Sequence, residues 1–299
     1  MRSTLKNNLT LSAAGIGYIG DSFNNTNTAR AYYYLEDHGL DGVYTPDAIL
    51  LDEQVIEACA NGDEFSFEDF VSAFFIEQNI ISTNLDPCSN NILTQLKPLQ
   101  QNDIAKIIAR FGAPNSIYNW VIQASTPTVP GNAAETDWKR DAGGNAIDYN
   151  YLTHMNPSYL NQATKIAIAR TILHELLHTY LISLVDDTIL TGSNDVTNFP
   201  MLWNALVNNT YNNNPNQLQH EIIGRKFIEP LRDALKEWDG AQQPNQYYED
   251  LAWGALFGTG TFNALFPSGS ADRNRIINTN NAEDTNSTQG GITPKSNPC

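Results

Sequence analysis

Cysteine and histidine are scarce in this chain of 299 residues, which contains three cysteines and five histidines. The cysteines form no CxxC pair, and this spacing excludes a zinc ribbon. Their odd number leaves at least one of them without a partner within the chain. A disulfide between Cys88 and Cys299 would tie down the C-terminal tail and would require an oxidising compartment. Three unrelated thiols fit the sequence equally well.

Basic residues are also few, because 17 Lys and Arg stand against 33 Asp and Glu, giving a formal net charge of -16. Such a surface repels phosphate backbones, so we expect no nucleic acid as the main partner. No apolar run is long enough to span a membrane, and the N-terminal stretch lacks the clean apolar core of a signal peptide. The compartment therefore stays open.

Hydrophobic residues make up 41% of the chain and aromatic residues 10%, which is enough for a buried core. The pattern predicts a helical N-terminal region over 1–80, a mixed helix and strand domain over 81–267 and a polar tail over 268–299. The tail is rich in Asn, Ser, Thr, Gly and Asp, so we expect it to be poorly ordered.

Apolar spacing and turn residues predict the elements within these regions. The predicted helices are 28–37, 47–60, 67–80, 90–100, 102–112, 159–185, 199–209, 217–238 and 245–257. The predicted strands are 116–125 and 146–152, joined by a long turn-rich connection. Pro230 is expected to kink the helix over 217–238, because proline disrupts a helix interior.

Two acidic turns, 37–47 and 61–70, have a partial similarity to EF-hand calcium loops. In the first, Gly39 stands at the third loop position and Ala48 where the bidentate glutamate is required. The second is one residue short. We therefore favour acidic turns that cap helices over calcium sites.

The segment TILHELLHTYL, residues 171–181, lies in the strongest predicted helix. His174 and His178 are four residues apart, so a helix places both imidazoles on one face, where they can bind one metal ion. Glu175 lies about 100° round the helix and can reach a water on that metal. This HExxH pattern is typical of zinc peptidases and predicts two zinc ligands with Glu175 as general base. Two polar residues on an ordinary helix are the alternative.

The third ligand has to come from elsewhere, because Leu181 and Leu184 stand where the metzincin pattern requires Gly and His. His220, near the start of a later predicted helix, is the first choice, followed by Glu221 and then Asp195. Asp186 and Asp187 are further acidic candidates in the segment that follows. A regular helix points His220 and Glu221 about 100° apart, so only one of them can ligate the metal.

Three segments together resemble SprT-like zincin metallopeptidases of a poorly characterised bacterial subset. They are ATKIAIARTILHELLHTYL, HEIIGRKFIEPLRDAL and DLAWGALFGT, and the resemblance covers roughly residues 80–265. HExxH is specific for zincins, whereas the later segments are weaker motifs. The resemblance implies an α+β minimal zincin, with a small sheet beside the active-site helix and with His174, His178 and His220 as zinc ligands. It also implies that the strand over 146–152 lines the cleft, where substrate backbone could add to its edge.

Two departures limit what the resemblance implies. SprT-like proteins that act on DNA-bound proteins often carry a basic or zinc-ribbon module, which this acidic chain lacks, and residues 1–80 lie outside the resemblance. We therefore expect a zinc-dependent peptidase acting on a protein or peptide, without a role on DNA. The alternative is a non-catalytic module of zincin fold, braced by zinc or metal-free. A di-iron carboxylate bundle would need a second ExxH motif, which the chain does not contain.

Overall fold

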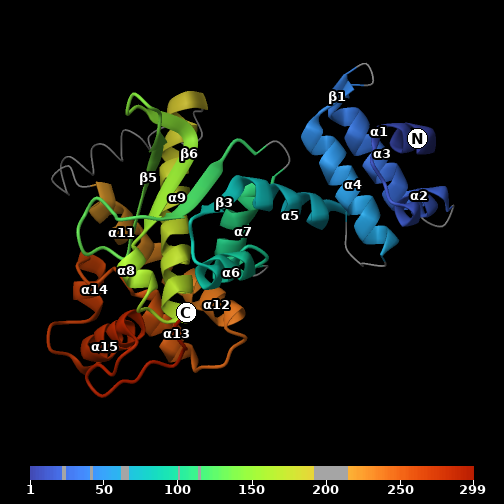
Figure 1. Cartoon of the computed structure of the whole chain (residues 1–299). Helices are drawn as coiled ribbons and strands as arrows, with labels where there is room; N and C mark the ends of the chain where they lie inside the picture. The colour runs from blue at the N-terminus through green and yellow to red at the C-terminus, as the bar shows by residue number, and fades with distance from the viewer. Residues whose placement is uncertain (22–24, 41–42, 62–66, 100–101, 114–115, 192–214) are drawn as a thin grey trace. The chain divides into compact units, whose positions relative to one another are not determined.

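The computed structural model of the chain (Figure 1) describes residues 1–21, 25–40, 43–61, 67–99, 102–113, 116–191 and 215–299. The chain divides into two compact units, each with its own hydrophobic core. The first comprises Met1–Phe75 and Gly112–Pro114, and the second comprises Ile76–Phe111 and Asn115–Cys299. The segment 268–299, expected to be a separate region, belongs to the second unit.

The first unit is mostly helical, as its apolar spacing predicts. Its elements are α1 (Arg2–Asn8), α2 (Ala13–Gly20), α3 (Asn25–Asp37), the hairpin of β1 (Gly39–Leu40) and β2 (Val43–Tyr44), α4 (Pro46–Ala60) and most of α5 (Phe67–Asn79). Thr45 caps the start of helix α4, where its hydroxyl accepts the N–H of Ala48. The two EF-hand-like turns include residues 41–42 and 62–66, which lie outside the described part of the chain.

The second unit is built on a four-stranded mixed sheet with the order β3-β4-β6-β5. Strands β3 (Ile80–Thr83), β4 (Asn119–Ala124) and β6 (Ala146–Met155) are parallel, and β5 (Ala134–Arg140) runs antiparallel to β6. The predicted α+β class is therefore confirmed. The prediction of a turn-rich connection across 126–145 is wrong, because β5 forms there.

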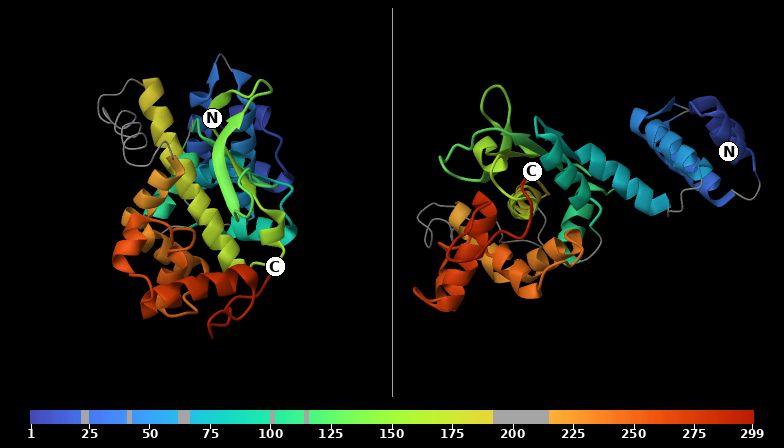
Figure 2. Two further views of the ribbon diagram at one scale, coloured as in Figure 1. Left: turned by 90° about the vertical axis from the view of Figure 1, so that its left-hand side faces the viewer. Right: turned by 60° about the horizontal axis from the view of Figure 1, so that its bottom comes forward.

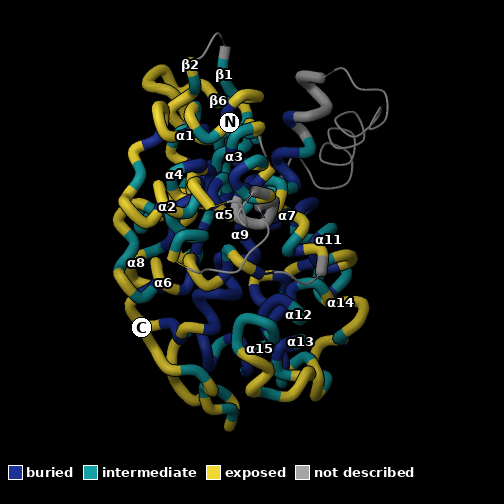
Figure 3. Tube along the Cα trace, turned by 90° about the vertical axis from the view of Figure 1, so that its right-hand side faces the viewer, coloured by how far each residue is buried: buried dark blue, intermediate teal, exposed yellow. Residues whose placement is uncertain are grey.

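The second unit also contains several helices besides this sheet (Figure 2). They are α6 (Pro87–Leu96), α7 (Asn102–Phe111), α8 (Pro157–Leu160), α9 (Lys165–Thr191), α11 (Pro215–Lys226), α12 (Ile228–Trp238), α13 (Asn245–Ala252), α14 (Gly260–Leu265) and α15 (Ala271–Thr285). Every residue of α9 from 166 to 179 is buried (Figure 3). A helix enclosed on all sides requires partners for its polar side chains, and the metal-centre candidates are among those side chains.

The predicted helix over 217–238 is two helices in the structure. Phe227 separates α11 from α12, with a backbone outside the helical region. Pro230 then lies in the first turn of α12, where its missing N–H would have had no partner within the helix. The expected kink at Pro230 is therefore wrong, and the break lies three residues earlier. The predicted helix over 199–209 lies outside the described residues.

The prediction of a poorly ordered tail is also wrong. Helix α15 begins at Ser270, whose hydroxyl accepts the N–H of Arg273, and Asn286 ends it in the left-handed region with φ of 47°. The polar side chains that suggested disorder instead bond to distant parts of the chain. Asn280 and Asp284, for example, accept hydrogen bonds of 2.7 and 2.8 Å from the guanidinium of Arg170 on α9.

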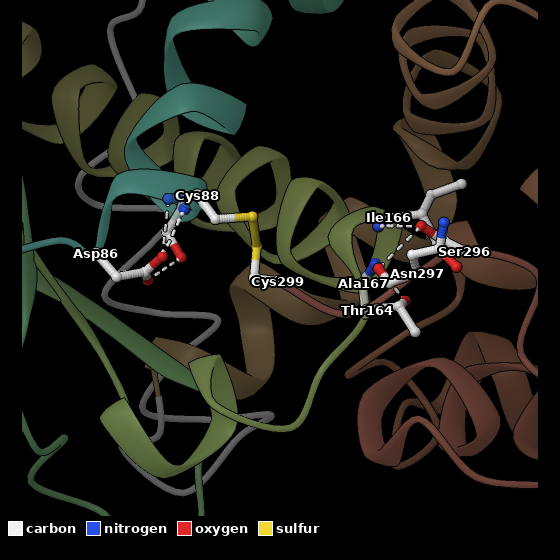
Figure 4. The surroundings of a disulfide bond; sticks show 9 residues. Asp86, Cys88, Thr164, Ile166, Ala167, Ser296, Asn297 and Cys299 are labelled. Atoms are coloured by element: carbon white, nitrogen blue, oxygen red, sulfur yellow. Dashed lines mark hydrogen bonds between the residues drawn. A yellow bond between two sulfur atoms is a disulfide. The ribbon is translucent and has the colours of Figure 1, made fainter.

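The end of the chain also caps the buried helix α9 (Figure 4). The N–H of Lys165 donates to the carbonyl of Asn297 at 2.9 Å, and the N–H of Ile166 donates to the hydroxyl of Ser296. Because the first N–H groups of a helix have no partner within it, these bonds stabilise its start. The predicted disulfide is confirmed, since Cys299 is bonded to Cys88, while Cys59 is free.

None of the described helices is both long enough and apolar enough to cross a bilayer.

Candidate metal centre

Three histidine side chains from two helices meet in the second unit. His174 and His178 lie on one face of α9, four residues apart, and His220 lies on α11. The Nε2 atoms of His174 and His178 are 3.1 Å apart, and those of His178 and His220 are also 3.1 Å apart. The third separation, between His174 and His220, is 3.3 Å. The three nitrogens therefore form a nearly equilateral triangle.

This triangle fits a metal ion. Zn–N bonds of about 2.0–2.1 Å in a tetrahedral site place the ligand nitrogens about 3.3–3.4 Å apart. The observed separations of 3.1 to 3.3 Å agree with that value. Within the described part of the chain, no fourth His, Cys, Asp or Glu joins the group. Three protein ligands with one open position are the arrangement of catalytic zinc, whereas structural zinc sites have four.

Burial keeps two of these imidazoles in the neutral form that binds metals. It lowers the pKa of His174 well below its usual value, and the neighbouring His178 and His220 act in the same direction. Burial, together with His178, lowers the pKa of His220 to about 3. Neutral imidazoles whose lone pairs converge on one point form a site suited to a cation.

Gln219 fixes the orientation of His178. The Nδ1–H of His178 donates to the amide oxygen of Gln219, which leaves Nε2 unprotonated and directed towards the other two histidines. Gln219 directly precedes His220 on α11, so one turn of one helix supplies both a ligand and the support of another ligand. The sequence reasoning missed this residue, and its only signal was that adjacency.

The carboxylate of Glu175 is hydrogen-bonded to the sheet. Its Oε2 accepts a hydrogen bond of 2.6 Å from the hydroxyl of Thr136 on β5. Burial raises the pKa of Glu175, while the neighbouring His178 and the bond from Thr136 oppose that increase. A carboxylate with a raised pKa beside a metal site is suited to accept a proton and to return it.

The acidic candidates for the third ligand have other roles where the structure describes them. Glu221 accepts hydrogen bonds from the N–H groups of Gly260 and Thr261 at the start of α14. Burial alone would raise the pKa of Glu221, but the hydrogen bonds from Thr261 and Gly260 outweigh it and lower the pKa below its usual value. Asp186 accepts bonds from Trp138 and Tyr151, which join α9 to the sheet.

The remaining two acidic candidates cannot be placed, because the side chain of Asp187 and all of Asp195 lie outside the described residues. A second group, Asp86 with Cys88 and Cys299, also has ligand atoms close together. Its two sulfur atoms are joined in the disulfide and are not available to a metal. Among the described residues, His220 is therefore the side chain that completes the pair predicted from the sequence.

The strand expected at the cleft edge lies elsewhere in the sheet. Strand β6, which contains residues 146–152, pairs with β4 on one side and with β5 on the other. In the described part of the chain β5 pairs only with β6, so β5 is the edge strand, and it packs against α9. The edge beside Glu175 is therefore β5.

No protein-family model, curated protein or solved structure matches the chain. The resemblance to SprT-like zincins stays a prediction, and we infer the function from the geometry of the site.

Proposed function

We propose that the second unit is a zinc-dependent metallopeptidase, with His174, His178 and His220 as the metal ligands. The observation that carries this proposal is the triangle of the three Nε2 atoms, together with the buried Glu175 on the helix that holds His174 and His178. The SprT-like motifs of the sequence also support the proposal. The net charge of -16 favours a protein or peptide substrate over one bound to nucleic acid.

In this proposal the chain supplies the proton transfers and the metal supplies charge. Zinc held by three imidazoles would acidify a water and polarise the carbonyl of the scissile peptide bond. Glu175 would accept the proton of that water and deliver it to the leaving amine. Gln219 keeps His178 in the tautomer that can bind the metal.

The free edge of β5 is suited to hold an extended substrate. Its outer N–H and C=O groups have no strand partner in the described part of the chain. A peptide that adds to this edge would form main-chain hydrogen bonds largely independent of its sequence. Since Thr136 of β5 contacts Glu175, the bound backbone would lie beside the proposed catalytic base.

Glu175→Gln is the test, combined with metal analysis and a screen against a broad peptide library. The purified protein should contain one zinc per chain and cleave some of the peptides. Glu175→Gln should retain the zinc, because Glu175 is not a ligand, and should lose about 10²- to 10⁴-fold in kcat. The matched control is Glu229→Gln, which changes an exposed glutamate on α12 in the same way and should leave both zinc and cleavage unchanged.

Normal cleavage by Glu175→Gln would refute the mechanism. A protein that binds one zinc and cleaves nothing in the library would favour the alternative, in which zinc only braces the fold. In that case removing zinc with a chelator should lower the melting temperature without any loss of a hydrolytic activity.

A further inference from the structure

A line of three hydrogen bonds crosses the sheet and ends at Glu175. The indole Nε1–H of Trp120 on β4 donates to the hydroxyl of Thr153 on β6 at 2.8 Å. The hydroxyls of Thr153 and Thr136 are 2.5 Å apart, and Thr136 donates to Glu175 at 2.6 Å. The line therefore joins three adjacent strands to the active-site helix.

Strand pairing explains how these side chains come into line. Thr136 and Thr153 are direct partners in the β5–β6 register. Trp120 is paired with Tyr151, two residues before Thr153, so Trp120 and Thr153 are on the same face of the sheet. Trp120 and Thr153 are buried, with exposed fractions of 2% and 0%. Because the sheet fixes all three side chains, the last hydroxyl has one position relative to α9.

The direction of each bond follows from the chemistry of the groups. An indole N–H can only donate, and a carboxylate can only accept. Thr136 uses its single proton on Glu175, so Thr153 has to donate to Thr136 and accept from Trp120. Each hydroxyl is then satisfied by one donated and one accepted bond. In the described part of the chain, Thr136 provides the only hydrogen bond to the Glu175 carboxylate.

We propose that Thr136 is a positioning residue for the general base, oriented in turn by Thr153 and Trp120. This inference rests on the proposed peptidase function. By holding Oε2, Thr136 selects one rotamer of Glu175 and leaves Oε1 to receive the proton of the attacking water. A carboxylate without this bond can rotate away from the cleft, so its loss slows the chemical step and leaves substrate binding unchanged.

The test compares Thr136→Val, which removes the hydroxyl at nearly constant shape, with Thr136→Ser, which retains it. Thr136→Val should keep its zinc and its KM within twofold and lose roughly 10- to 100-fold in kcat. Thr136→Ser, which keeps the hydroxyl, should retain most of the wild-type kcat. Thr153→Val, one step further from Glu175, should have a smaller loss because Thr136 can still donate.

Thr28→Val in the first unit is the matched control. Thr28 is also buried, with an exposed fraction of 0%, but its hydroxyl has no hydrogen-bond partner among the described residues. The substitution should leave kcat unchanged, and this separates the loss of a bonded hydroxyl from a general effect of valine in the core.

A second measurement is independent of activity. The infrared difference between metal-free wild type and Glu175→Gln isolates the carboxylate stretch of Glu175. The band should shift in Thr136→Val and return in Thr136→Ser. An unshifted band, a kcat within twofold of wild type in Thr136→Val, or equal losses in Val and Ser would overturn the proposal. If the wild type cleaves no peptide, the peptidase proposal fails, and the infrared band alone decides whether Thr136 holds the carboxylate.

Discussion

Both units bury an aspartate in a helix, but among the described residues only the second unit provides that aspartate with hydrogen-bond partners. Asp250 on α13 has an exposed fraction of 2%, and its carboxylate accepts hydrogen bonds from Arg275 and Gln246. Asp52 on α4 has an exposed fraction of 0%, and neither of its oxygens has a hydrogen-bond partner in the part of the chain that the structure describes. Burial alone raises the pKa of Asp52 to about 8.

The difference shows what a polar interior contributes. In the second unit, partnered groups hold α9 and the sheet in fixed positions, as Arg170 and the Trp120–Thr153–Thr136 line show. Catalytic groups need that precision, since a displacement of about 1 Å is costly to a reaction. In the first unit Asp52 has no such role among its contacts, and it reduces stability through its lost hydration.

The largest effect that would separate the two aspartates is expected from Asp250→Leu. The substitution leaves Arg275 without its buried partner and should lower the stability of the second unit by about 3 kcal/mol. Amide exchange of α13 would measure the change. Asp233→Leu, which removes a half-exposed acid on α12, should change the stability by no more than about 0.5 kcal/mol. Similar effects of the two substitutions would show that the burial of Asp250 is unimportant.

Replacing the buried aspartate of the first unit by leucine should raise the stability of that unit. Asp52→Leu removes a buried group that has no partner, and it should stabilise the first unit by roughly 1–3 kcal/mol at pH 7. Amide exchange of α4 is the measurement, because it reports the opening of that unit separately. Asp52→Asn should abolish the pH dependence without the full gain, since it retains a polar group. A loss of stability in Asp52→Leu would mean that Asp52 has a partner in solution.

The smallest predicted effect is the change in the stability of the first unit over one unit of pH. Folded Asp52 retains its proton up to about pH 8, whereas an unfolded aspartate releases it near its ordinary pKa of 3.8. The first unit should therefore lose stability as the pH rises between these values. Above pH 8 this loss is complete, and below pH 4 it is absent.

The metal-free second unit should respond with the opposite sign. Burial lowers the pKa of His174 and His220, so the folded unit binds fewer protons than the unfolded chain below about pH 6.5. Its stability should fall as the pH falls from 6.5 towards 3. Amide exchange of α4 and α9 across pH 4 to 8, corrected for intrinsic rates, would compare the two units in one sample. If the stability of both units changed in the same direction with pH, the roles given to Asp52, His174 and His220 in these pH responses would be wrong.

The pair His174 and His178, with Glu175 between them, could be predicted because helical periodicity is a local property. Positions four apart on a helix share a face in any fold. Two of the strands and most of the described helices were predictable for the same reason. His220 was the preferred third ligand because few histidines were available, but its convergence on the pair depends on how α11 packs.

The residues that support the site had no comparable local signal. Gln219, Thr136 and Thr153 are ordinary polar residues in the sequence, and β5 reads as part of a connection. The tail was misjudged because its Asn, Ser and Asp residues resemble those of disordered segments. Their partners, including Arg170 and the start of α9, are more than 100 residues away along the chain.

The sequence by itself determined the chemistry that is available: an HExxH helix, a third histidine, an acidic surface and a pair of cysteines able to bond. The tertiary structure decided how that chemistry is arranged. It brought His220, and not Glu221, beside His174 and His178, and it ordered the tail. It also made β5 an edge strand among the described residues and connected Glu175 to the sheet through Thr136. The physical reason is that short-range periodicity is encoded in neighbouring residues, whereas the partner of a buried polar group is set by the packing of distant segments.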